Sequence, residues 1–327
     1  MSRARLGRRT VVTAVAGVLL AGCGRDGAAT LVPGQALGAP TVHTLTPGPP
    51  AGALAPASLP PAEPWVPSGR EVEPEAKIAA VRVVEALGST GTDGASVRQR
   101  LARIGADPRL AGAGAPLVPP STSGVTHVVY PQYGGLTDRR ASVMVVAEQS
   151  WVTEVGLARR TLTADVRVRR EGSSWRVEDV LVPSAADPVR VDDAVPRLLA
   201  EPNVELPHAA ASDLAGGQVD RSVVEALLTL SASYRLSVSV FRSGHPEEVF
   251  GTGTTSNHTR GRAVDIWAVD GTPVVSMRRD DPVLTGFLDA ARATGSDEVG
   301  GPVDRDGPGG AHFANALHRD HVHIGFD

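Results

Sequence analysis

Ten prolines lie between residues 24 and 72, and they decide where in this 327-residue chain a globular fold can begin. They stand among Gly, Ala and Thr, with few apolar residues that could form a periodic face. A segment of this composition buries too little apolar surface to offset the entropy that ordering costs. The sequence therefore predicts a disordered tether over residues 23–72, with folded domains confined to the residues that follow it.

The residues before the tether have the pattern of a bacterial export signal. Four arginines within the first nine residues precede an apolar run over residues 11–20, which is shorter than the about 20 residues that a membrane-spanning helix needs. Leu20-Ala21-Gly22-Cys23 follows, and this end resembles the lipobox of bacterial lipoproteins. The resemblance implies a signal peptide over residues 1–22, lipidation at Cys23, and a lipoprotein anchored in the cell membrane outside the cytoplasm. The pair Arg8-Arg9 leaves export open between the general secretory and the twin-arginine routes.

The net charge and the single cysteine limit the classes of partner and the covalent cross-links that we expect for this chain. The net charge is −4, from 32 basic and 36 acidic residues, so no field of one sign favours nucleic acid and we expect no such partner. Cys23 is the only cysteine, which excludes an internal disulfide. Lys77 is the only lysine, and this preference for arginine indicates a GC-rich coding sequence of the actinobacterial kind.

Residues 73–185 have the pattern of a small α+β domain. Pro74 suits the first turn of a helix, and apolar residues then recur at helical spacing as Ile78, Val81, Val84 and Leu87. Strands are predicted at 143–147 and 161–170, the latter continuing through the turn at 171–174 into a hairpin with one buried face. The pattern resembles the cystatin-like or nuclear-transport-factor-2-like folds. The segment shows no cluster of titratable residues, which favours a binding or spacer role over catalysis.

Residues 186–217 are predicted to be a connection, and residues 218–327 a second α+β domain. Asp220 caps one predicted helix, and Asp281 caps another that has Pro282 at its first position and ends at Gly295. Strands are predicted at 236–240, 262–268 and 321–326. Helices and an antiparallel sheet in this order indicate the α+β class for the whole fold.

Histidines and one aspartate of this second domain have the pattern of a metal site. His258 precedes Asp265 by seven residues, and His321 and His323 alternate in a predicted strand, so that both imidazoles face the same side. Asp265 lies in an apolar strand, where a buried carboxylate is costly unless a cation neutralises it. Imidazole and carboxylate are zinc ligands, and a catalytic zinc site uses three protein ligands.

The same residues resemble a known family. Its pattern is Ser-x-His-x-x-Gly-x-Ala-x-Asp followed far downstream by His-x-His, and the chain matches it at Ser256, His258, Gly261, Ala263, Asp265, His321 and His323. Residues 218–327 are thereby similar to the group that contains lysostaphin, D-Ala-D-Ala metallopeptidases and the hedgehog domain. The resemblance implies a hedgehog/DD-peptidase-like antiparallel sheet with helices, and a zinc ion held by His258, Asp265 and His323. It also implies that His321 lies beside the metal as base or transition-state stabiliser.

Further site residues are expected around this motif. The family often has an arginine near the scissile carbonyl, and Arg242 at the end of a predicted strand suits an oxyanion or a substrate carboxylate. Some carboxypeptidases have a glutamate three residues before the last ligand, where this chain has Asp320, so the general base is either His321 or Asp320. Ser256 and His318 are expected to bind substrate.

Together, these features predict that the chain is a zinc metallopeptidase that hydrolyses peptide bonds of peptidoglycan stem peptides at the cell envelope. Whether it is a D-Ala-D-Ala carboxypeptidase or an endopeptidase stays open. One alternative is a non-catalytic lipoprotein that contains zinc and binds peptidoglycan or a partner. Another is a scaffold whose 73–185 domain binds a partner.

Overall fold

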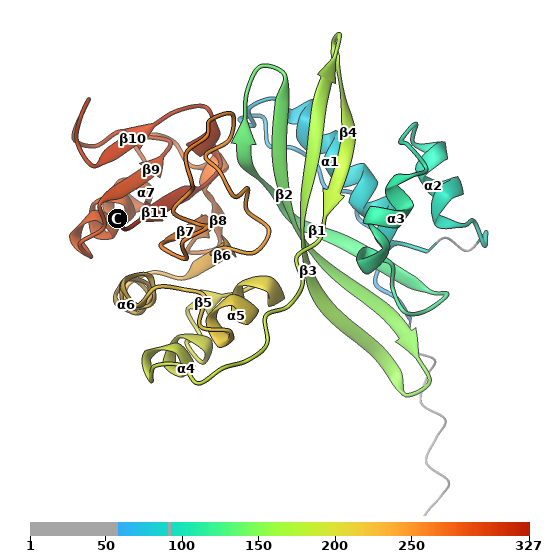
Figure 1. Cartoon of the computed structure of the whole chain (residues 1–327), viewed down its shortest axis with the longest axis horizontal. Helices are drawn as coiled ribbons and strands as arrows, with labels where there is room; N and C mark the ends of the chain where they lie inside the picture. Colours follow the sequence, from blue (N-terminus) through green and yellow to red (C-terminus); the bar gives the residue numbers. More distant parts are fainter. Residues whose placement is uncertain (1–57, 91–92) are drawn as a thin grey trace, which may run out of the picture. The chain divides into compact units, whose positions relative to one another are not determined.

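The computed structural model describes residues 58–90 and 93–327, which belong to one compact unit that spans Leu54–Asp327. The predicted signal peptide, Cys23 and the predicted tether up to residue 57 lie outside the described residues. The described chain is α+β, as predicted, and contains two β-sheets (Figure 1). We call α1 (Pro74–Gly88) to β4 (Ser174–Leu181) the N-terminal subdomain and α4 (Ala194–Leu199) to β11 (Val322–Gly325) the C-terminal subdomain, because each has its own hydrophobic core.

The N-terminal subdomain is an antiparallel sheet in the order β1-β2-β3-β4, with helix α1 packed against it (Figure 1). The predicted helix at Pro74 is confirmed, and its apolar stripe faces the sheet with Val81, Val84 and Leu87 buried. The elements are α1 (Pro74–Gly88), α2 (Val97–Arg103), α3 (Leu110–Ala113), η1 (Ala115–Leu117), β1 (Gly124–Leu136), β2 (Arg140–Thr153), β3 (Gly156–Glu171) and β4 (Ser174–Leu181).

The C-terminal subdomain contains a seven-stranded sheet in the order β10-β9-β11-β7-β6-β5, with β8 paired to β7. Its central pairs are antiparallel, as expected, but the edge pairs β10–β9 and β5–β6 are parallel, so the sheet is mixed. The strands are β5 (Val204–Glu205), β6 (Leu236–Val240), β7 (Ala263–Val269), β8 (Thr272–Pro273), β9 (Glu298–Gly301), β10 (His312–Ala314) and β11 (Val322–Gly325). The hedgehog/DD-peptidase-like fold stays a prediction.

The helices of this subdomain begin where the sequence predicts a cap. The Asp281 carboxylate accepts hydrogen bonds from the first turn of α7, which has Pro282 at its first position. Asp220 caps α6 in the same way. The helices are α4 (Ala194–Leu199), α5 (His208–Ala215), α6 (Arg221–Leu230), η2 (Val274–Ser276), α7 (Pro282–Ala293) and η3 (Leu317–Arg319).

The end of the predicted tether, residues 58–72, lies against the fold. Trp65 packs against the N-terminal core, and the guanidinium of Arg70 donates a 2.9 Å hydrogen bond to the carbonyl oxygen of Met277 in the C-terminal subdomain. The predicted disorder therefore does not extend through residue 72, because the Trp65 side chain and the Arg70 hydrogen bond anchor the residues before α1.

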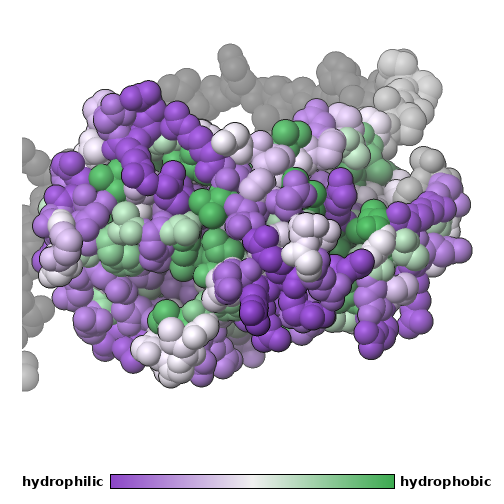
Figure 2. Space-filling view, turned by 90° about the horizontal axis from the view of Figure 1, so that it is seen from above, coloured by the Kyte–Doolittle hydropathy of each residue, from purple (hydrophilic) through white to green (hydrophobic). Residues whose placement is uncertain are grey.

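One face of the molecule is mostly hydrophilic, with small hydrophobic patches scattered among polar residues (Figure 2). Over residues 58–90 and 93–327, the helices all lack the length and apolar character that crossing a bilayer requires.

Candidate metal centre

Two of the predicted ligands lie opposite each other on neighbouring strands. Antiparallel pairing of β11 with β7 sets His323 against Asp265, and directly paired residues have adjacent side chains. Nδ1 of His323 lies 2.9 Å from Oδ1 of Asp265. Both residues are nearly buried, with 8% and 1% of their surface exposed.

The third predicted ligand, His258, comes from the loop that leads into β7. Gly261 turns the chain there with a φ of 71°, and a Cβ atom at this position would lie 2.0 Å from the carbonyl oxygen of Gln218. Only glycine fits both constraints. The Ser256 hydroxyl accepts a 3.3 Å hydrogen bond from the backbone N–H of His258. The turn at Gly261 therefore explains how two residues seven positions apart, His258 and Asp265, come to lie side by side.

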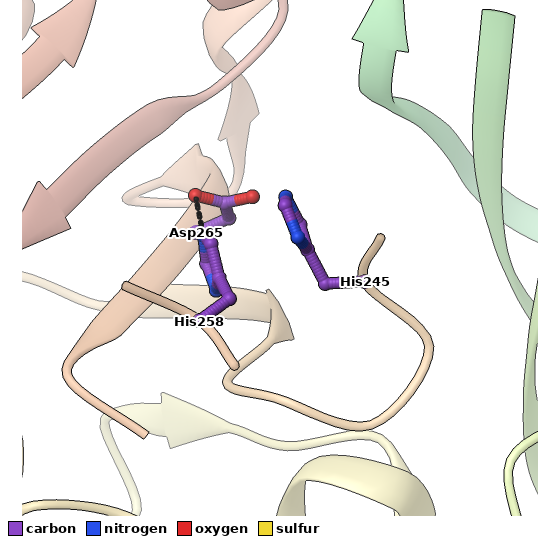
Figure 3. Close-up of side chains that lie close together, drawn as sticks. All are labelled: His245, His258 and Asp265. Atoms are coloured by element: carbon purple, nitrogen blue, oxygen red, sulfur yellow. Dashed lines mark hydrogen bonds and ion pairs between the residues drawn. The ribbon is translucent and has the colours of Figure 1, made fainter. Parts of the chain in front are cut away.

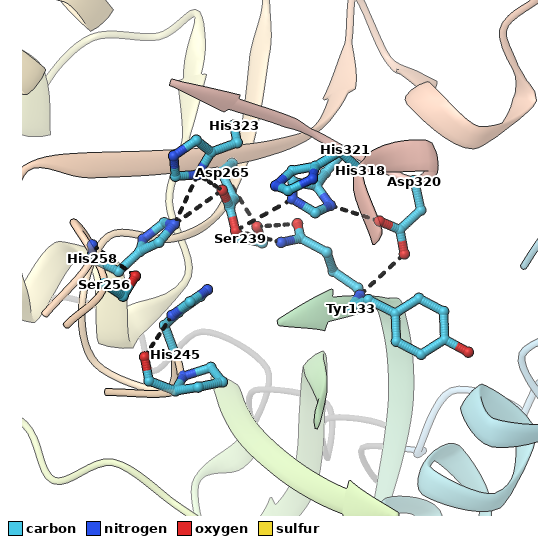
Figure 4. Close-up of polar contacts among 12 residues, drawn as sticks. Tyr133, Ser239, His245, Ser256, His258, Asp265, His318, Asp320, His321 and His323 are labelled. Carbon is cyan, nitrogen blue, oxygen red and sulfur yellow. Dashed lines mark hydrogen bonds and ion pairs between the residues drawn. The ribbon is translucent and has the colours of Figure 1, made fainter. Parts of the chain in front are cut away.

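The three ligand atoms converge on one point (Figure 4). Nε2 of His258 lies 3.2 Å from Oδ1 of Asp265 and 3.1 Å from Nδ1 of His323, which completes a triangle with the 2.9 Å contact. Ligand atoms about 2.0–2.1 Å from a tetrahedral zinc ion lie roughly 3.3–3.4 Å apart. The observed triangle is close to that size.

Hydrogen bonds on the far side of each imidazole fix which nitrogen faces the triangle. Nδ1 of His258 donates to the carbonyl oxygen of Phe241 at 2.5 Å, and Nε2 of His323 donates to Oε1 of Glu298 at 3.1 Å. In neutral rings the other nitrogens then carry lone pairs that face the Asp265 carboxylate. Three electron-rich atoms in contact need a proton or a metal ion between them, and outer hydrogen bonds of this kind are typical of metal-binding histidines.

The close contacts in the triangle shift the pKa values of His323 and Asp265. Burial disfavours charge on the His323 imidazole, but hydrogen bonds to Asp265 and Glu298 outweigh burial and raise its pKa to about 9. Burial likewise disfavours charge on Asp265, yet the neighbouring His258 and His321 hold the pKa of that carboxyl well below its usual range. In the metal-free chain the centre thus favours an ionised Asp265 beside a protonated His323, and a metal ion would have to displace that proton.

A fourth residue, His245, lies next to this triangle. His245, His258 and Asp265 form a cluster that could hold a metal ion, with ligand atoms within 4.8 Å of one another (Figure 3). The His245 ring stacks on that of His258 at 3.9 Å between centroids. Burial, and then the nearby His258, lower the pKa of His245 well below its usual value, so its imidazole is neutral. The His323 contacts are 2.9–3.1 Å, so His323 and His245 are both candidates for the third ligand beside His258 and Asp265.

The two candidate bases have different surroundings. Nδ1 of His321 lies 2.6 Å from Oδ1 of Asp320, and its Nε2 lies 3.7 Å from Oδ2 of Asp265 (Figure 4). The second oxygen of Asp320 accepts from the backbone N–H of Tyr133 at 3.1 Å and from Lys77 at 2.6 Å. Asp320 is therefore saturated with donors, whereas His321, which is as deeply buried at 2% exposed, lies beside the triangle and lines the cavity.

A cavity of about 390 Å³ opens over the triangle. This volume lies within the usual range of ligand pockets. The predicted substrate-binding residues Ser256 and His318 both line it. Nδ1 of His318 lies 2.8 Å from the amide oxygen of Asn315, and its ring meets Phe313 edge to face at 4.8 Å.

The structure does not bring Arg242 to this cavity. Its side chain is exposed, and the described residues that line the cavity include Arg260 instead. The backbone N–H of Arg242 bonds the carboxylate of Asp213, which sets the chain direction after β6. The catalytic role of Arg242 stays a prediction, because Arg242 is not among the described residues that line the cavity.

Sequence reasoning missed several residues of the centre. His245 follows β6, which the structure pairs with β7, and its place just after the predicted strand 236–240 was the only local signal for its proximity to Asp265. Glu298 had no local signal, because a single glutamate in a strand has no pattern. Lys77, Gln132 and Tyr133 belong to the N-terminal subdomain, which we expected to be separate from the site.

Comparisons with known proteins give no match: no family model fits the chain, and neither a curated protein nor a solved structure is significantly similar to it.

Proposed function

We propose that this chain is a zinc-dependent peptidase that hydrolyses peptide bonds of peptidoglycan stem peptides at the cell envelope. The observation that carries the proposal is the convergence of His258, Asp265 and His323 to within 2.9–3.2 Å, with His321 beside them. The match of these four residues to the lysostaphin, D-Ala-D-Ala metallopeptidase and hedgehog pattern supports it.

The donor set fits zinc. Two imidazole nitrogens and one carboxylate oxygen are the ligands of many hydrolytic zinc sites, which leave one position open for water or substrate. The cavity above the triangle supplies that access. A bound zinc ion would supply Lewis acidity, polarising a peptide carbonyl and lowering the pKa of a water.

The residues around the ligands have separate roles in the proposal. His321 accepts or stabilises a proton at Nε2, because its Nδ1 is held by Asp320 and its Nε2 faces the ligand triangle. Asp320 orients His321 rather than acting as base, because both of its oxygens already accept hydrogen bonds. His318 and Ser256 contact substrate in the cavity.

The substrate and location follow from the family resemblance and from Cys23. A lipid-anchored protein outside the cytoplasm of a wall-bearing bacterium meets stem peptides as its abundant peptide substrate. The Pro-rich residues before the fold would let the site reach into the wall, because a flexible tether of about 34 residues spans on the order of 30 Å.

Hydrolysis by the purified full chain tests the proposal. We would incubate it with stem pentapeptides and with cross-linked muropeptides, with and without a chelator, and identify the products by mass. Chelator-sensitive release of D-alanine supports a carboxypeptidase, and internal cleavage supports an endopeptidase. Stoichiometric zinc with no cleavage of either substrate contradicts the peptidase and supports a binding lipoprotein.

A further inference from the structure

The only lysine of the chain lies at the boundary between the two subdomains. Lys77 belongs to α1, is 0% exposed, and uses its ammonium group on three oxygens. It lies 2.5 Å from Oε2 of Glu71, 2.6 Å from Oδ2 of Asp320, and 3.3 Å from the hydroxyl oxygen of Tyr130. A fully buried ammonium is costly unless it is paired, so this geometry is fixed.

Through Asp320, the lysine reaches the catalytic side of the centre. One carboxylate oxygen of Asp320 contacts Lys77 and the other contacts Nδ1 of His321 at 2.6 Å. Lys77 therefore determines the direction in which Asp320 presents its second oxygen. That direction in turn fixes the ring of His321, whose Nε2 faces Asp265.

Strand β1 makes a second contact of this kind with a ligand. The side-chain amide of Gln132 donates a 2.7 Å hydrogen bond to Oδ2 of Asp265. The Ser239 hydroxyl donates to the amide oxygen of Gln132 at 2.5 Å, so the amide nitrogen must face Asp265. Gln132 is 0% exposed. Its hydrogen bond occupies one oxygen of Asp265 and leaves Oδ1 for the triangle.

Two glycines let the strand approach this closely. A Cβ atom on Gly135 would lie 2.2 Å from the ring of Phe250, and one on Gly134 would lie 3.0 Å from Pro246. Pro246 and Phe250 belong to the loop that carries His245. The end of β1 is therefore a wall of the cavity, which Tyr133 and Gly134 line.

We infer that the N-terminal subdomain is part of the metal centre, with Gln132 positioning the ligand Asp265 and Lys77 positioning His321 through Asp320. This inference rests on the proposed zinc centre. Neither residue touches substrate, so each acts through the residue that it holds. The metal site is thus built from both subdomains, and the N-terminal one is more than a spacer or a separate binding module.

The first arm of the test measures zinc affinity and does not depend on hydrolysis. Gln132→Met removes the donor to Asp265 and keeps the side-chain volume. Zinc alone is titrated into the metal-free full chain against a competing chelator, and we expect the Kd to rise about tenfold to a hundredfold, as for other outer-sphere partners. Gln149→Met is the matched control, because Gln149 is an equally buried amide in the same sheet that bonds only groups of the N-terminal subdomain.

The second arm measures turnover. Lys77→Met is expected to lower kcat about tenfold with KM and zinc affinity within threefold of the wild type. Glu71→Gln is the control: it removes the other buried ion pair of the same lysine and leaves the contact with Asp320 intact. If Lys77→Met does not fold, the double variant Glu71→Gln/Lys77→Met has one fewer unpaired carboxylate and is compared with Glu71→Gln.

The outcomes separate this inference from the proposed function. Weaker zinc binding in Gln132→Met and lower kcat in the lysine variant, with both controls near wild type, support it. If each variant matches its control in zinc affinity and kcat while the wild type binds zinc and cleaves peptides, the inference is wrong and the proposed function stands. A purely structural role would lower the thermal stability of variant and control alike without separating their kcat or Kd values.

Discussion

Nε2 of His258 lies 3.1 Å from Nδ1 of His323, although the two residues are 65 positions apart in the chain. The opposite nitrogen of each ring donates to an oxygen, so the two lone pairs point at each other and at Asp265. Facing lone pairs beside a buried carboxylate need a proton or a metal ion between them, and in the metal-free chain the raised pKa of His323 lets a proton take that place. This relationship, more than the count of histidines, is why we assign a metal to the centre.

The third ligand can be identified by comparing two histidines. His323→Ala is expected to weaken zinc binding by more than about a hundredfold, because structural zinc sites gain 10–16 kcal/mol over four ligands, or about 3 kcal/mol for each. His245→Ala should retain zinc within about tenfold, because its ring stacks on His258 without closing the triangle. Competitive titration with a chromogenic chelator measures both. Loss of zinc in His245→Ala but not in His323→Ala would reverse the assignment.

Binding and turnover should separate at His321. His321→Ala is expected to keep its zinc and to lose about 10²- to 10⁴-fold in kcat, the usual contribution of a positioned acid or base. Steady-state hydrolysis and metal analysis of the same preparation test this. His127→Ala is the control, because His127 is exposed on β1 outside the cavity. If His321→Ala kept full turnover, the general base would have to be another residue, and Asp320 would be the first candidate.

Zinc binding should release protons at neutral pH. The pKa of His323 is raised to about 9, above its usual 6.5, so in the metal-free chain the protonated form is favoured below about pH 9. Zinc must displace that proton, so we expect about one proton released per zinc at pH 7 and progressively less above pH 9. Calorimetric titration in buffers of different ionisation enthalpy measures the number. A binding enthalpy independent of the buffer at pH 7 would refute the prediction.

Arg260, which lines the cavity, and Arg242, which does not, should differ in their effect on substrate binding. Arg260 lines the cavity, and a stem-peptide carboxylate within its reach would gain a charged hydrogen bond, so Arg260→Ala should raise KM about tenfold. Arg242 is exposed and outside the lining, so Arg242→Ala should change kcat/KM less than threefold. Initial rates over a range of stem-peptide concentrations distinguish them. A large fall in kcat for Arg242→Ala would restore the oxyanion role that the sequence predicts.

Local patterns predicted the elements well. The capping residues Asp220 and Asp281 and the proline at position 282 mark helix starts that the structure has at the expected places. Strand 236–240 is β6 as predicted, because alternation and the following turn are both local signals. The sequence also predicted strands at Asp265 and His323, and the structure pairs those two strands, so the two residues that the resemblance implies as ligands lie side by side.

The contacts between the subdomains could not be predicted in this way. Lys77 lies on a helix whose periodicity assigns it no partner, and its pairing with Asp320 joins residues 243 positions apart. Gln132 is one polar residue in a strand that the sequence did not mark, because Pro131 and the glycines at 134 and 135 weaken the strand pattern. Long-range packing, not local propensity, brings these side chains to the centre.

An X-ray structure of the zinc-loaded full chain, with anomalous data collected on both sides of the zinc absorption edge, tests the central claim most directly. We predict one zinc peak bonded to Nε2 of His258, Oδ1 of Asp265 and Nδ1 of His323 at about 2.0–2.2 Å. A zinc peak elsewhere, or a chain that contains no zinc after saturation, would contradict the account.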